Sequence, residues 1–141
     1  MSVCRVLAPS MINVLFKTES HFPVNRKKIK QVLSAALGGR VRSNTEVSVS
    51  IVGDRRMREL NGKYRQVNET TDVLSFPLTD HTARGVPFVD APDGVLRLGD
   101  IVVSYPQAVE EAAAENKLVD DKIVELVLHG LNHLLGIHHE E

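Results

Sequence analysis

The sequence predicts an α+β fold, a single domain with a four-stranded mixed sheet covered by helices. Two observations predict it. Segments with strand and helix patterns follow one another in the order strand, helix, strand, helix, two strands, two helices, without repeats or low-complexity stretches. The chain has 141 residues, of which 43% are hydrophobic and 25% charged, a composition typical of a globular domain with a buried core.

The first predicted strand and helix lie in the N-terminal third of the chain. Residues 12–16 have the pattern of a strand. Asn25 can cap a helix that runs to Leu37, because apolar side chains recur there at helical spacing and form one face. Gly38 and Gly39 then end this helix.

The second predicted strand is followed by a short helix. Residues 46–52 alternate valine and isoleucine with polar residues, the pattern of a half-buried strand. Asp54 caps a helix that carries Met57 and Leu60 on its apolar side. This helix is expected to stop near Gly62.

A long loop separates the third and fourth predicted strands. Residues 73–76 form the third strand, which Pro77 ends, and residues 100–104 form the fourth. The segment over residues 78–98 contains prolines and glycines. A loop of this length is expected to serve function.

Two helices complete the predicted fold. Ser104 caps a helix over residues 105–116, and the last helix covers residues 119–135. Residues 1–10 are expected to form an irregular leader. The single domain is then expected over residues 11–141.

The sequence favours a cytoplasmic location. It has no signal-peptide pattern and no apolar run near the roughly 18 residues of a membrane span, so no membrane association is expected. Its single cysteine, Cys4, cannot form an internal disulfide. Both observations are consistent with a reducing compartment.

Charge is distributed unevenly along the chain. Residues 1–65 hold 13 of the 17 basic and 4 of the 18 acidic residues, a balance of +9. Residues 66–141 hold the other 4 basic and 14 acidic residues, a balance of −10. This asymmetry indicates a basic surface for a polyanion, unless the two halves interleave in space and their charges cancel.

Three histidines near the C-terminus have the spacing of a metal site. His129 and His133 are four residues apart, which puts both imidazoles on one face of a helix. Gly136 can adopt the left-handed conformation that ends the helix, so that the chain turns and brings in His139. Three nitrogen ligands leave a fourth position on Zn²⁺ for water, as in catalytic sites. The sequence therefore predicts one zinc ion on the C-terminal helix and the following turn.

The same offsets occur in the metzincin proteases, where a glutamate directly after the first histidine is the general base. Here that position is Gly130. The ligand pattern is present and the proteolytic base is absent, which moves the expected chemistry away from peptide hydrolysis. Residues 11–141 are expected to form a metal-dependent hydrolase domain. A metal-dependent peptidase or amidohydrolase remains an alternative function for this domain.

Two further motifs accompany the histidines, one over residues 60–77, which contains Tyr64-Arg65, and one over residues 98–104. Together the three resemble the YbeY family of endoribonucleases, which are rRNA maturation factors, over about residues 46–139. The resemblance implies a mixed sheet with helices and a zinc-dependent, single-strand-selective endoribonuclease. It implies action in maturing the 3′ end of small-subunit rRNA and in ribosome quality control. The implied partners are single-stranded RNA, rRNA, ribosomal subunits and small-subunit assembly proteins.

The resemblance also assigns site residues. His129, His133 and His139 match the family's three zinc ligands, and Arg65 matches an arginine that is important for activity. We therefore predict Arg65 and His129 as catalytic residues. A planar guanidinium with five donors suits a phosphate and the extra charge of its transition state. The alternative for Arg65 is a structural salt bridge or a carbonyl cap.

The sequence departs from the family at three places. His138 directly precedes His139 and could compete with it, although only His139 keeps the offset of ten from the first ligand. Thr70 stands where the family often has proline. The chain stops at Glu141, where most family members continue into another helix, and this is expected to weaken the third ligand.

The proton acceptor of the reaction is not identified by the sequence. Zinc lowers the pKa of bound water from about 15.7 toward about 7, and either this hydroxide or the 2′-OH of the RNA attacks. Asp72 and Asp100 either orient a histidine ligand or serve as hydrogen-bonding partners at strand ends. A non-catalytic ribosome assembly factor is a further alternative. A plain RNA-binding module is not supported, since only two tyrosines and four phenylalanines are available to stack on bases.

Overall fold

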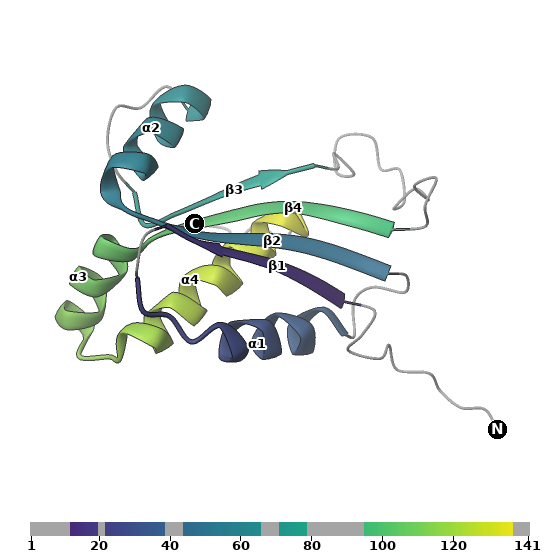
Figure 1. Ribbon diagram of the computed structural model, residues 1–141, viewed down its shortest axis with the longest axis horizontal. Coiled ribbons are helices and arrows are strands. Elements are labelled where there is room, and N and C mark those ends of the chain that lie inside the picture. The colour runs from purple at the N-terminus through teal and green to yellow at the C-terminus, as the bar shows by residue number, and fades with distance from the viewer. Residues whose placement is uncertain (1–11, 20–21, 39–43, 66–70, 79–94, 137–141) are drawn as a thin grey trace.

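The structure, a computed structural model, describes residues 12–19, 22–38, 44–65, 71–78 and 95–136. The predicted leader over residues 1–10, Thr70, and both His138 and His139 lie outside the described residues. The single domain over residues 11–141 stays a prediction. The predicted α+β fold with a four-stranded mixed sheet is confirmed (Figure 1).

The sheet has the strand order β1-β2-β4-β3 (Figure 1). The three strands β1 (Ile12–Thr18), β2 (Asn44–Val52) and β4 (Val95–Ser104) are parallel. The fourth, β3 (Val73–Pro77), pairs with β4 in the antiparallel direction. Because β3 is an edge strand of the described sheet, no further strand of that sheet pairs with its outer side. Side chains from other elements can lie there.

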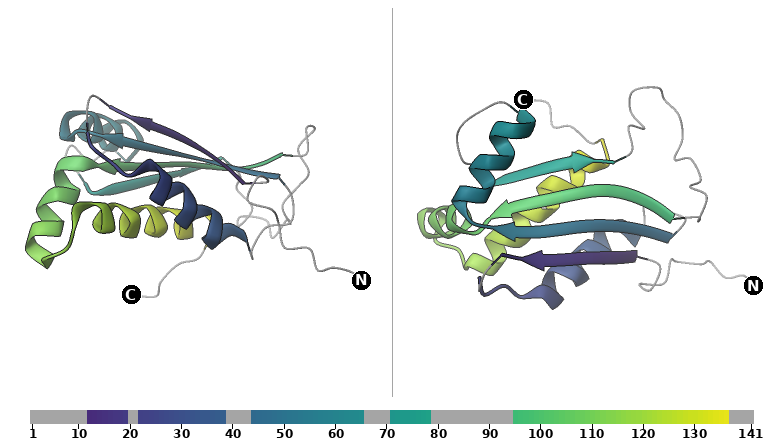
Figure 2. Two further views of the ribbon diagram at one scale, coloured as in Figure 1. Left: turned by 60° about the horizontal axis from the view of Figure 1, so that its bottom comes forward. Right: turned by 45° about the horizontal axis from the view of Figure 1, so that its top comes forward.

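Helices lie on both faces of the sheet. α1 (Arg26–Gly38) and α4 (Val119–Leu134) cover one face, and α3 (Tyr105–Glu115) packs against α4 at one end of that layer (Figure 2). α2 (Asp54–Arg65) lies on the opposite face, at one end (Figure 2). None of the described helices is long and apolar enough to cross a membrane.

The two faces of the sheet carry cores of different size. The larger core lies between the sheet and the layer of α1 and α4, and it contains the most deeply buried side chains of those helices. The smaller core lies under α2 and consists of Val52, Met57, Leu74 and Val102. Among the described residues, α2 is the only helix on this face, and it covers the face only in part.

β4 is longer than predicted because the sheet accommodates a glycine. The strand begins at Val95, so residues 95–98, which we expected to be loop, belong to it. The register shifts beside β2, where Glu46 pairs with Arg97 and Val47 pairs with Gly99. Gly99 has a φ of 141°, which only glycine adopts readily. A glycine inside a strand marks a bulge here rather than the end of the strand.

The predicted helix caps are mostly confirmed. Asn25 Oδ1 accepts a hydrogen bond from Lys28 N at 3.0 Å, and Ser104 Oγ accepts one from Gln107 N at 3.3 Å. Gly136 has a φ of 81°, the left-handed conformation expected just after α4. α2 is the exception, because it continues through Gly62 to Arg65. This extension carries Arg65 on the end of a helix rather than on a loop.

Candidate metal and phosphate site

His129 and His133 project from the last two turns of α4 with their imidazoles side by side. Their Nε2 atoms are 3.2 Å apart and their ring centroids are 4.7 Å apart. Both side chains are exposed. The spacing of four residues places them on one helix face, as the sequence predicts. Both rings thus present Nε2 to the same region of solvent.

The distance between the two Nε2 atoms fits a shared metal ion. Two nitrogen ligands on a tetrahedral zinc ion, each about 2.0–2.1 Å from the metal, are about 3.3 Å apart. The observed 3.2 Å is close to that spacing. Among the described residues, no three His, Cys, Asp or Glu side chains form a metal-binding group. The described residues therefore supply no third ligand of these types. The predicted third ligand, His139, lies outside the described residues.

Arg65 lies in the same cavity as the two histidines, although it comes from the other side of the sheet. The cavity has a volume of about 380 Å³. It lies at β3, between α4 and the residues Arg65, Thr71 and Asp72. Its lining residues are Arg65, Thr71, Asp72, Val73, Leu74, Ser75, His129, Gly130 and His133. The fold therefore brings together a guanidinium and two imidazoles that are more than 60 residues apart in the sequence.

Gly130 faces the sheet, where no larger side chain fits. A Cβ atom built on it would lie 2.7 Å from Ile101 Cγ2 and 3.5 Å from Val73 Cγ2. The glycine thus lets α4 lie close against β3 and β4, which carries His129 to the cavity. The missing protease base has a structural reason, because a glutamate at this position would collide with Ile101. This geometry argues against the peptidase alternative.

Asp72 lies beside the candidate site. It lines the cavity of Arg65 and also a second cavity of about 380 Å³ on the other side of His129. Its backbone carbonyl accepts a hydrogen bond from Ser104 N at 2.9 Å, so it is a strand-end partner as expected. Burial raises the pKa of Glu111, and the hydrogen bond with Asp72 and the negative charge of Asp72 raise it further, while Lys122 opposes both.

Asp100 lies on the opposite face of the sheet from the histidines. It lines a third cavity together with Arg56 and Tyr64 of α2. Successive side chains of a strand point to opposite faces, and the next residue, Ile101, is the one that contacts α4. Asp100 is therefore not the residue that orients His129 or His133.

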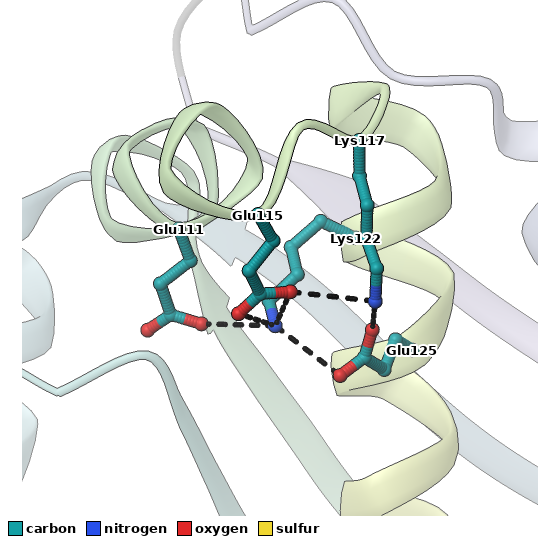
Figure 3. A network of polar contacts seen from close by, with 5 residues as sticks. All are labelled: Glu111, Glu115, Lys117, Lys122 and Glu125. Atoms are coloured by element: carbon teal, nitrogen blue, oxygen red, sulfur yellow. Dashed lines mark hydrogen bonds and ion pairs between the residues drawn. The ribbon is translucent and has the colours of Figure 1, made fainter.

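A buried lysine in the first turn of α4 joins this helix to α3 (Figure 3). Lys122 is only 4% exposed. Its Nζ lies 3.0 Å from Glu115 Oε2, 3.2 Å from Glu125 Oε2 and 3.3 Å from Glu111 Oε1. Lys117 pairs with Glu115 and Glu125 at the edge of the same cluster. Burial alone would lower the pKa of Lys122, but the three carboxylates outweigh it and raise that pKa.

The role of Lys122 was not predicted from the sequence, although a signal was present. Lys122 stands four residues before Leu126 and one before Ile123, on the buried side of an otherwise apolar helix face. A lysine in that position requires buried anionic partners. Lys122 and His129 both line the second cavity, so this cavity connects the cluster to the candidate metal site.

The cluster makes stability depend on pH in the acid range. The hydrogen bond from Lys122 lowers the pKa of Glu115, and hydrogen bonds from Lys117 and then Lys122 lower the pKa of Glu125. A carboxyl group with a lowered pKa stabilises the fold above its unfolded value of about 4.5. That stabilisation is lost as the pH falls through the lowered folded value.

We expect Lys122→Met to destabilise the protein by about 1–3 kcal/mol at pH 7. The loss is below that of a fully buried pair, because the side chains of the three glutamates are 31–49% exposed. The variant should also lose less stability than the parent below pH 4.5, since Glu115 and Glu125 each lose one of their two lysine partners. Urea unfolding at several pH values measures both effects. Lys28→Met, which removes the surface pair with Asp121, is the control and should change stability much less than Lys122→Met. Identical acid dependence in Lys122→Met and the parent would contradict the prediction.

Comparison with known proteins identifies the family. The family model described as "Endoribonuclease YbeY" matches residues 14–141. A protein named endoribonuclease YbeY from Dehalococcoides mccartyi is 35% identical over 135 residues, which cover 92% of this chain and 84% of that protein. Another from Aquifex aeolicus is 35% identical over 118 residues, covering 84% and 72%.

A solved structure has a similar fold. The solution structure of TM1509 from Thermotoga maritima matches with a TM-score of 0.59 and 26% sequence identity. The match covers 90% of this chain and 75% of that one. The predicted resemblance is confirmed by the family model and by the sequence relatives. The chain belongs to the endoribonuclease YbeY family, whose name denotes a nuclease, and hence a hydrolase, that cleaves within RNA chains.

Proposed function

We propose that the protein is a zinc-dependent endoribonuclease that cleaves single-stranded RNA. The observation that carries the proposal is one cavity that holds Arg65 from α2 and both His129 and His133 from α4. Membership of the endoribonuclease family supports RNA as the substrate. We further propose that it acts in the cytoplasm on the 3′ end of small-subunit rRNA and in ribosome quality control. Ribosomal subunits and small-subunit assembly proteins would then be its partners.

The histidine pair fits the proposed metal ion. His129 and His133 would bind it, and the offset of ten assigns His139 as the third ligand. The two exposed imidazoles have an Nε2–Nε2 separation of 3.2 Å, which is close to the spacing of two nitrogen ligands on one ion. When bound, zinc supplies a Lewis acid and a water molecule of lowered pKa.

The protein's own groups bind and orient the phosphodiester. The Arg65 guanidinium lies on an exposed helix end and can donate two parallel hydrogen bonds to one phosphate. As negative charge builds on the phosphate oxygens, these charge-assisted bonds strengthen, so Arg65 stabilises the transition state more than the ground state. Ser75 and Asp72 line the same cavity and offer a hydroxyl and a carboxylate to the ribose hydroxyls.

The shape of the site favours single strands. The cavity lies at the edge of the sheet and is bounded by side chains from four separate elements or connections. A phosphate must reach Arg65 and the histidines at the same time, between α2 and α4. A flexible single strand can bend into such a recess, whereas a duplex presents its phosphates on a stiff, wide surface.

We expect Arg65→Ala to reduce kcat for single-stranded RNA by about 10²–10³-fold while zinc content stays at one ion per chain. Arg65→Lys should restore part of the activity, since it keeps the charge without the paired donors. Arg58→Ala is the matched control, because Arg58 is an exposed arginine of the same helix that does not line the cavity. Steady-state cleavage of a labelled RNA and metal analysis check this. If Arg65→Ala and chelator-treated parent both cleave as fast as untreated parent, the proposed site is wrong.

A further inference from the structure

The open face of the sheet carries a third cavity, away from the histidines. Its floor includes side chains from two neighbouring rows that cross the sheet, because the strand registers align them. All of these side chains point to the α2 face. The members that line the cavity are Ser48, Asp100 and Phe76 of one row, and Lys17, Ser50 and Val102 of the other.

One face of α2 closes this cavity from the side. Arg56, Leu60 and Tyr64 follow one another at intervals of four residues, so they form a single stripe along the helix. All three line the cavity, together with Phe76 and Asp100 from the sheet. The cavity has a volume of about 320 Å³. Its lining combines apolar side chains with polar and charged groups from several elements.

Tyr64 and Phe76 form an aromatic platform at this cavity. Their ring centroids are 5.0 Å apart with an interplanar angle of 59°. Tyr64 is 55% exposed, so a large part of the ring faces solvent. The ammonium group of Lys63 lies 5.3 Å from its centroid. A half-exposed aromatic ring held against a second ring, with a cation beside it, suits stacking with a nucleobase.

The polar groups around the platform match a nucleotide. Asp100 is a hydrogen-bond acceptor next to Phe76 in the sheet, and it can accept from the amino group of a base. Its negative charge disfavours a phosphate in the cavity floor. Lys17 and Arg56 also line the cavity and can contact phosphate oxygens at its edge. Arg56 also contacts Glu59 at 3.4 Å, a surface pair that RNA can displace at small cost.

We propose that this cavity is a nucleobase-binding subsite for the same RNA strand, with Tyr64 stacking on the base and Asp100 accepting from its amino group. The inference rests on the proposed function. Tyr64 and Arg65 are consecutive residues, and they line different cavities on either side of β3. A strand whose phosphate lies at Arg65 therefore presents a neighbouring base to Tyr64. The end of α2 then both orients the scissile phosphate and binds a flanking base.

The test measures binding rather than cleavage. Full-length, metal-free protein is titrated into a fluorescent single-stranded RNA of ten nucleotides, and anisotropy reports the Kd. Tyr64→Ala should weaken binding by about 5- to 150-fold, the loss of one base–aromatic stack. Tyr64→Phe keeps the ring and should bind within about twofold of the parent. Leu118→Ala, which truncates a side chain that is 72% exposed and outside the cavity, is the control.

Two further variants test the charged groups. Lys17→Ala should reduce the slope of log Kd against log salt by about 0.7, one phosphate contact of a single strand. Lys30→Ala removes an exposed lysine of α1 outside the cavity and should leave the slope unchanged. Asp100→Asn should weaken binding to oligomers of amino-bearing bases more than to oligouridine, because uracil has no amino group.

The outcomes separate this inference from the proposed function. If the parent binds and cleaves RNA and Tyr64→Ala binds with unchanged Kd, the subsite is wrong and the proposed function stands. That result would assign the open face to a protein partner instead. If the parent neither binds nor cleaves single-stranded RNA, the proposed function fails and the subsite fails with it. A photocrosslink from 5-iodocytidine RNA to Tyr64, absent in Tyr64→Ala, is the expected positive result.

Discussion

His129→Ala is expected to lower kcat/KM for single-stranded RNA by at least about 10³-fold and to abolish stoichiometric zinc binding. The two Nε2 atoms, 3.2 Å apart, are already spaced for one ion, so removing either leaves at most two nitrogen ligands. His133→Ala should have an effect of the same size. Metal analysis of dialysed protein and cleavage of labelled RNA measure both quantities. A variant that keeps zinc and activity would contradict the metal site.

The same experiment decides between two neighbouring histidines. Only His139 stands ten residues after His129, so His139→Ala should lose zinc and His138→Ala should retain it. The two variants are closely matched, because both replace a histidine with alanine at adjacent positions. Loss of zinc in His138→Ala with retention in His139→Ala would show that the offset does not select the ligand. Circular dichroism controls for folding in both variants.

Gly99→Ala is expected to destabilise the protein by about 3–5 kcal/mol. Two costs combine at this position. The backbone has a φ of 141°, a conformation that is strained for any residue with a Cβ atom. The added Cβ would lie 2.2 Å from the carbonyl oxygen of Phe76 and 2.9 Å from Pro77 Cα, both parts of the paired backbone of β3. Relief of this contact requires β3 to separate from β4.

The substitution should also affect the candidate site, because β3 supplies Val73 and Ser75 to its cavity. Gly38→Ala is the matched control. A Cβ at Gly38 meets no atom within 4 Å, and the residue is the last of α1, so this change should be neutral or stabilise by up to about 1 kcal/mol. Urea unfolding compares the two variants with the parent. A Gly99→Ala variant as stable as Gly38→Ala would show that the bulge tolerates a side chain.

The local pattern of the sequence predicts most of the elements. Strand alternation and helical spacing depend on near neighbours, and so do caps such as Asn25 and Ser104, which act within three residues. The histidine pair belongs to the same class, because an interval of four residues places two side chains on one helix face. These features appear in the structure where the sequence predicts them.

The predictions of element ends are wrong where one residue type occurs in more than one structural setting. In the sequence alone, a glycine predicts the end of a helix or strand, yet Gly62 lies inside α2 and Gly99 lies inside β4. At Gly99 the neighbouring backbone of β3 requires a residue without a side chain. The stacking proposed for Tyr64 depends on its exposure and its contact with Phe76, neither of which the local sequence pattern shows.

The sequence by itself determined the order of the elements, the helical histidine pair, the absence of a protease-type glutamate and the resemblance to the family. All of these depend on residues that are close in the chain or on motifs in a fixed order. Only the tertiary structure decided that Arg65 and His129 share a cavity, that Asp100 faces away from them, and that Tyr64 lines a separate cavity. The reason is physical, since strand order, register and the faces that helices cover are set by long-range packing, which no local periodicity encodes.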